Sequence, residues 1–95
     1  MATRTSPDAD EDFAGIYARG WEKYREQEAE AYALGLLDAF ALLAANPYIG
    51  RERTEVSPPV RLYSHRAHHI LYVIESGDVL VLRILHGRQD WLHQL

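Results

Sequence analysis

The sequence predicts an α+β fold in which a helical hairpin packs on an antiparallel sheet. Apolar residues recur at spacings of three and four over the first half of the chain, whereas the second half resembles three strands. Two helices followed by strands are typical of a two-layer sandwich. A chain of 95 residues has room for one core, so we expect a single domain over residues 1–95.

The first helix is expected to begin at Ser6-Pro7-Asp8. Serine caps a helix N-terminus, proline fits its first position, and an acid faces the positive end of the helix dipole. An apolar stripe follows at helical spacing, made of Phe13, Ile16, Tyr17, Gly20 and Tyr24. The preceding residues, Ala2–Thr5, are a candidate for a short first strand.

The second helix is expected from Gln27 to Ala45. It ends before Asn46-Pro47, because proline disfavours helical geometry in the residue that precedes it. The short break near residues 24–28 makes the two helices an antiparallel hairpin. A polar loop over Pro47–Pro59 then leads to the strands.

Three strands are predicted at Val60–Ser64, His69–Glu75 and Val79–Leu85, with Gly77-Asp78 as a two-residue turn. This turn pairs Ser76 with Val79 and divides the last two strands into two faces. The face expected under the helices holds Leu71, Val73, Leu80, Leu82 and Ile84. The opposite face holds Ile70, Tyr72, Ile74, Val81, Arg83 and Leu85.

The second face is also mostly apolar, although a two-layer protein has no further layer to cover it. Such a patch indicates an interaction site, unless the N-terminal strand, the 47–59 loop or the C-terminal tail folds over it. Arg83 is expected opposite Tyr72, either stacked on that ring or paired with a partner's carboxylate.

Composition narrows the function classes. The chain has no cysteine, which excludes a disulfide framework, a thiol nucleophile and a thiolate metal site. The net charge of −4 argues against strong non-specific binding to nucleic acid. The N-terminus is polar and acidic and the apolar runs are short, so we expect a cytoplasmic protein without a membrane span. No glycine-rich nucleotide loop is present, and no cofactor is expected.

His65, His68 and His69 invite a metal interpretation. Neighbouring strand residues point to opposite faces, so His68 and His69 cannot hold one ion together without a bulge. We expect surface loop histidines and no metal.

Several segments together resemble ParE-type toxins of the RelE/ParE superfamily. Leu42–Arg51 is similar to that family's helix end and "NP-x-x-G" loop, and Tyr72 lies in a stretch similar to its "IFYRV"-like strand. Val81–Arg88, followed by Gln-Asp-Trp-Leu, resembles the closing "V-L-R-V-L-H-G-R-x-D" motif. Asp12, Ile16 and Trp21 extend the likeness into the first helix. The chain departs from the family in its short first segment and in Val73, where many relatives have arginine.

The resemblance implies the toxin of a type II toxin–antitoxin system of the plasmid-stabilisation kind. Such a toxin poisons DNA gyrase and is neutralised by a ParD-type antitoxin in a hetero-oligomer. The antitoxin's ribbon-helix-helix part binds operator DNA, so the toxin meets that DNA only indirectly, and its C-terminal segment wraps the toxin. The residues expected to bind the antitoxin are Ile70, Tyr72, Ile74, Val81, Arg83, Leu85, Trp91 and Leu92.

The alternative is an mRNA endoribonuclease of the RelE branch, which cleaves messages on the ribosome. Members of that branch use clustered Lys and Arg and a C-terminal tyrosine. This chain has Lys23 as its one lysine, and no tyrosine follows Tyr72. The candidate groups for such a site are Arg61, His69, Arg83, His86, Arg88 and His93. We expect a non-catalytic toxin. A third possibility is a degenerate member that only binds its antitoxin.

Overall fold

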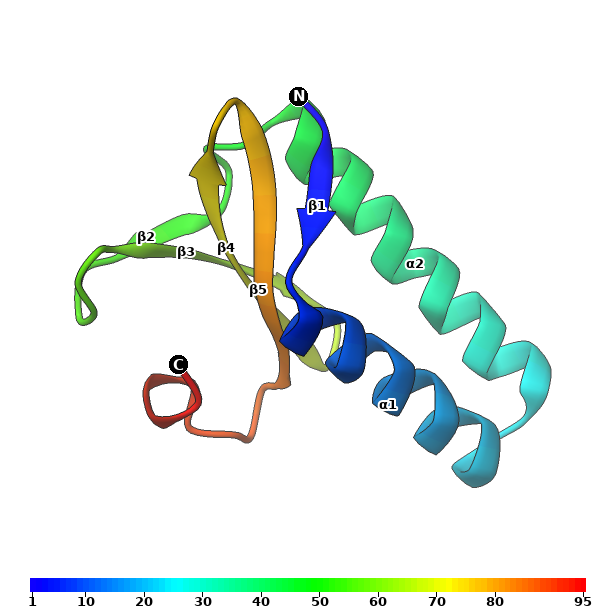
Figure 1. Cartoon of the computed structure of the whole chain (residues 1–95). Coiled ribbons are helices and arrows are strands. Elements are labelled where there is room, and N and C mark those ends of the chain that lie inside the picture. Colours follow the sequence, from blue (N-terminus) through cyan, green and yellow to red (C-terminus); the bar gives the residue numbers. More distant parts are fainter.

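The computed structural model describes all residues, 1–95, and has the predicted α+β architecture (Figure 1). Two helices cover one face of a five-stranded sheet, and a C-terminal tail follows the last strand. The elements in order are β1 (Thr3–Thr5), α1 (Pro7–Lys23), α2 (Glu26–Ala45), β2 (Arg51–Arg53), β3 (Val60–His65), β4 (His68–Glu75), β5 (Asp78–His86) and a 3-10 turn (Trp91–His93).

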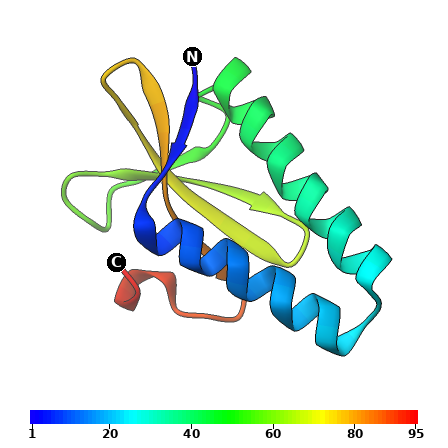
Figure 2. The same cartoon turned by 45° about the vertical axis from the view of Figure 1, so that its right-hand side comes forward.

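The helical hairpin begins and ends where the sequence predicts. Ser6 caps α1, with its Oγ accepting a hydrogen bond from the Ala9 amide at 3.0 Å, and α2 ends before Asn46-Pro47. Figure 2 shows the two helices joined at one end of the molecule. The helices approach closely at Gly20, where a Cβ would lie 3.3 Å from the Cβ of Ala29. No helix has both the length and the apolar composition that a membrane crossing requires.

The sheet has the strand order β1-β5-β4-β3-β2, and all neighbours are antiparallel except β1 and β5. The short first strand therefore forms, although it contains only three residues. Thr3 ties it to α2 by donating a hydrogen bond from its Oγ1 to the Phe40 carbonyl at 2.9 Å. β2 was not predicted, because Arg-Glu-Arg carries no alternation of apolar and polar residues.

The hairpin between β4 and β5 turns one residue earlier than predicted. Ser76 and Gly77 have φ values of 52° and 78°, and Glu75 pairs with Asp78. A turn with two residues at positive φ favours glycine in the second position, so Ser76-Gly77 form the turn and the prediction of Gly77-Asp78 was wrong. Tyr72 consequently lies opposite Val81.

A β-bulge then alters the register of β5. Leu82 is the extra residue, because Tyr72 pairs with Val81 and the next residue of β4, Leu71, pairs with Arg83. The predicted pairing of Arg83 with Tyr72 is therefore wrong. The bulge also brings Ile84 onto the same face as Val81.

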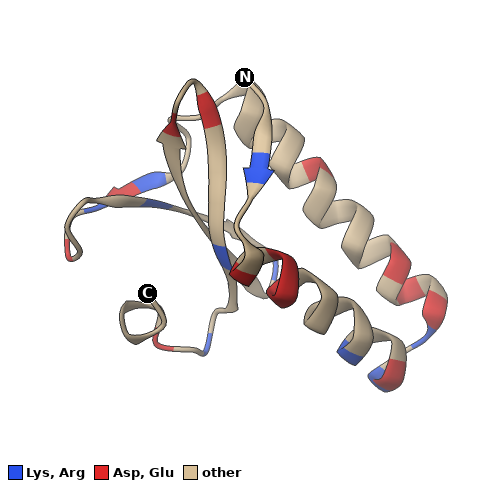
Figure 3. Ribbon diagram, viewed as in Figure 1, with Lys and Arg blue, Asp and Glu red and all other residues tan.

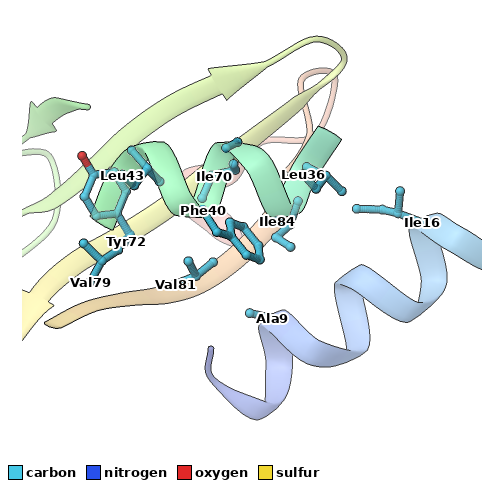
Figure 4. Packing of buried hydrophobic residues seen from close by; sticks show 11 residues of the cluster. Ala9, Ile16, Leu36, Phe40, Leu43, Ile70, Tyr72, Val79, Val81 and Ile84 are labelled. Carbon is cyan, nitrogen blue, oxygen red and sulfur yellow. The ribbon is translucent and has the colours of Figure 1, made fainter. Parts of the chain in front are cut away.

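The helices cover the face that was predicted to be open. The main core contains Ile70, Tyr72, Val79, Val81 and Ile84 of the sheet, packed against Ala9, Ile16, Leu36, Phe40 and Leu43 of the helices (Figure 4). The earlier turn shifts each β4–β5 pairing by two residues along β5, so the residues of β5 before the bulge keep their predicted faces. Beyond the bulge, Ile84 and Leu85 exchange faces. The hairpin pattern thus groups the residues of β5 correctly only up to Val81, and it does not determine which group the helices cover.

The other face forms a second, smaller apolar cluster. Val60, Leu71 and Leu85 are buried there, with Val56 and Trp91 packed against them. Val56 belongs to the loop before β3, and Trp91 belongs to the C-terminal tail. The loop and the tail therefore cover the face that was predicted to lie under the helices. The predicted cover of the Ile70 and Tyr72 face by the loop or the tail is wrong, because the helices cover that face.

Candidate interaction surfaces

The predicted antitoxin-binding residues do not share an exposed face. Ile70, Tyr72 and Val81 have no exposed surface in the main core, and Leu85 is buried in the second cluster. Others differ in setting: Ile74 and Trp91 are half-buried, Arg83 is half-buried and ion-paired, and Leu92 is exposed. The sequence grouped these residues from an open sheet face that the fold does not leave open.

Tyr72 instead anchors the loop that follows α2. Its Oη donates a hydrogen bond to the Pro47 carbonyl at 2.7 Å and accepts one from the Gly50 amide at 2.9 Å. A Cβ on Gly50 would lie 2.4 Å from that oxygen, so only glycine fits this approach. Burial raises the pKa of Tyr72 above its ordinary value. The motif Asn46–Gly50 is therefore explained by its contact with the sheet.

Arg61 holds the same loop from the neighbouring strand. Its Nη1 donates a hydrogen bond to the Gly50 carbonyl at 2.8 Å, and its guanidinium lies 5.0 Å from the centre of the Tyr48 ring. Tyr48 is 70% exposed, and Ile49 is exposed beside it. The loop thus presents two apolar side chains on a rigid backbone, which the sequence analysis did not identify.

The guanidinium of Arg83 finds its hydrogen-bond acceptors within the chain. Its Nε and Nη2 donate to the two carboxylate oxygens of Asp12 at 2.7 and 3.0 Å, and its Nη1 donates to the Gln94 carbonyl at 2.9 Å. Asp12 also accepts from the Ile84 amide at 2.9 Å. Hydrogen bonding to Asp12 raises the pKa of Arg83. Arg83 therefore joins α1, β5 and the tail, and the predicted stacking on Tyr72 does not occur.

A row of histidines crosses the helix-covered face at one end of the sheet. His65, His68 and His86 are cross-strand neighbours, and the Tyr32 Oη of α2 lies 2.6 Å from Nδ1 of His68. Burial, with the neighbouring His86 next in effect, lowers the pKa of His68 to about 4. The expectation of surface loop histidines was wrong, because β3 and β4 extend to His65 and His68 and both side chains are half-buried.

His69 lies on the opposite face, where its Nδ1 is 2.9 Å from the Oγ of Ser64. No group of three or more His, Asp or Glu side chains is arranged to hold a metal ion.

The candidate ribonuclease groups do not converge. Arg61 holds the loop after α2, Arg83 is paired with Asp12, and His93 contacts Asp90 in the tail. His69 and His86 lie on opposite faces of the sheet. Arg88 follows β5, where its amide donates to His86.

The exposed apolar side chains of α2 form a further surface, here called the α2 crest: Leu34, Leu37, Ala41 and Leu42. Leu34 is 61% exposed and Leu37 is 49% exposed. Asp38 is the one charged residue from position 31 to 45, and Figure 3 shows this part of α2 otherwise without charge. A groove of about 500 Å³ between β1, α1 and α2 adjoins the crest, and Phe13 and Phe40 line it. The sequence did not indicate the crest, because α2 is apolar almost all round.

Comparisons with known proteins agree with this architecture. Residues 4–91 match the family described as ParE toxin of type II toxin-antitoxin system, parDE. Toxin ParE1 of Mycobacterium tuberculosis is 35% identical over 90% of this chain and 88% of that protein. Toxin ParE3 of Caulobacter vibrioides is 39% identical over 59% of this chain and 56% of that protein.

A solved structure described as a chromosomal ParDE TA system from P. aeruginosa has the same fold. It superposes with a TM-score of 0.78 over 90% of this chain and 95% of that chain, at 21% identity. The family match spans nearly all of the elements described above, from β1 to the tail. The chain therefore belongs to the ParE toxin family of type II toxin–antitoxin systems.

Proposed function

We propose that this protein inhibits growth by poisoning DNA gyrase and that a ParD-type antitoxin neutralises it. The observation that carries the proposal is the match to the ParE toxin family over residues 4–91. Binding, not catalysis, is favoured because the candidate acid, base and phosphate-binding groups lie in separate places. A toxin that acts by binding needs a partner surface and no assembled reaction centre.

The α2 crest is the surface that we assign to the antitoxin. Clustered exposed apolar side chains on a small protein mark interaction sites, and here Asp38 lies between Leu34 and Leu42. An amphipathic partner segment fits a helix flanked by a groove. Burying a fully exposed leucine is worth about 1.5–3 kcal/mol. Leu34, Leu37 and Leu42 are roughly half exposed, so together they offer on the order of 2–4 kcal/mol before the costs of association.

The target is tested by inducing the toxin alone in cells and measuring DNA breaks, plasmid supercoiling and message integrity together. We expect DNA breaks and loss of supercoiling with intact messages. We expect co-expression of a ParD-type antitoxin to abolish both effects. Cleavage of ribosome-bound messages with normal supercoiling would assign the protein to the ribonuclease alternative. Unchanged growth with all three readouts normal would leave only a binding role.

A further inference from the structure

A second cavity, of about 450 Å³, lies between the end of α1, the start of α2 and the histidine row. Glu28 is the one acid that lines it, and the other polar side chains are those of Arg19, Lys23, Tyr24, Tyr32, His68 and His86. Ile16 and Ala29 supply part of an apolar wall. The proposed function does not involve this cavity.

Two cations at the cavity have no acidic partner. Arg19 and Lys23 take part in no ion pair, and the Nζ of Lys23 lies 5.8 Å from the centre of the Tyr24 ring. The guanidinium of Arg19 lies against the backbone of α1, where a Cβ on Gly15 would be 3.0 Å from its Nη1. Gly15 thus leaves room for this side chain beside the helix.

One histidine of the cavity adds an N–H donor. His86 accepts a hydrogen bond on Nδ1 from the Arg88 amide at 3.1 Å, so the neutral ring carries its proton on Nε2. The ring of His68 is held by Tyr32, whose Oη lies 2.6 Å from Nδ1 of His68 and donates to the His65 carbonyl at 3.5 Å.

A guanidinium, an ammonium and the N–H donor of His86 beside an apolar wall form a site for an anion with an apolar stem. We propose that this cavity receives an aspartate or glutamate side chain of the antitoxin, next to an apolar residue of the same segment. The inference rests on the proposed function, because it assumes an antitoxin. A nucleic acid fits less well, because the chain carries a net charge of −4, which disfavours non-specific binding to a polyanion.

The test is calorimetric titration of the folded toxin with its antitoxin, using Arg19→Gln and Lys23→Gln. Losing one member of a desolvated charge pair is expected to weaken binding about tenfold or more for Arg19→Gln. Lys23→Gln is expected to have a smaller effect. Arg25→Gln is the matched control, since Arg25 lies at the same end of the molecule but does not line the cavity, and it should change Kd less than about twofold.

The outcomes separate the two proposals. A parent toxin that does not bind the antitoxin would overturn the proposed function and this inference with it. If the parent binds the antitoxin and Arg19→Gln raises Kd no more than Arg25→Gln does, the inference is overturned and the proposed function stands. Rescue of Arg19→Glu by an acid-to-lysine change in the antitoxin would identify the carboxylate. Binding of a single-stranded DNA oligonucleotide by the parent and not by Arg19→Gln would replace the carboxylate with a phosphate and overturn the proposal.

Discussion

The hydroxyl of Tyr72, in β4, should stabilise the protein by anchoring the loop after α2 through two hydrogen bonds. Tyr72→Phe keeps the ring volume, so it leaves no cavity in the core, but it removes both hydrogen bonds of the hydroxyl. The amide of Gly50, a buried residue, then has no partner. An unsatisfied buried donor costs about 1–3 kcal/mol, and we expect a loss of that size.

Urea and thermal unfolding of the isolated domain measure this loss. For a domain of this size, 1 kcal/mol corresponds to a fall in Tm of roughly 4–8 °C, so Tyr72→Phe should melt at least about 4 °C below the parent. Tyr48→Phe is the matched control, because Tyr48 is 70% exposed, and it should stay within about 0.5 kcal/mol of the parent. If both variants have the same Tm and urea midpoint as the parent, the claim that the Tyr72 hydroxyl anchors the loop is wrong.

Two further predictions concern stability. Asp12→Ala should lower the free energy of unfolding in urea by about 2–3 kcal/mol, because it leaves the half-buried Arg83 and the Ile84 amide without their acceptor. Asp8→Ala is the control and should lower it little. Equal effects of the two substitutions would contradict this role for Asp12. The pKa of His68 is lowered to about 4 in the folded state. As the pH falls, His68 is therefore protonated in the unfolded chain at a higher pH than in the folded protein. Stability should therefore fall as pH decreases from about 6.5 toward 4, and His68→Gln should flatten this fall between pH 7 and 5 while His93→Gln should not.

The helices and strands could be predicted because their signals are local. Ser6-Pro7 and Asn46-Pro47 mark the beginning of α1 and the end of α2 through the conformations that serine and proline impose on adjacent residues. The covered face of the sheet could not be predicted, since both faces are apolar. Tyr72 faces the helices, where its hydroxyl finds partners in a loop 22–25 residues earlier in the chain, which no periodic pattern reports.

The interaction surfaces were harder to predict for the same reason. Arg83 and Asp12 are 71 residues apart, so their ion pair follows only from the packing of α1 against β5. The sequence pattern does not mark the α2 crest, because α2 has more apolar residues than the sheet can cover. Family resemblance gave the class of protein correctly but could not supply the register, because the bulge at Leu82 exchanges the faces of the residues that follow it.

Calorimetric titration of the antitoxin with a Leu37→Asp toxin tests the central claim most directly. Leu37 is about half exposed, so the substitution should leave the fold intact, but it would place a carboxylate within the proposed interface. We predict Kd at least about 30-fold higher, which corresponds to roughly 2 kcal/mol, with Glu22→Ala unchanged as the control. Parent-like affinity of Leu37→Asp, together with weakened binding of Leu92→Asp, would place the antitoxin on the C-terminal tail and contradict the assignment to the α2 crest.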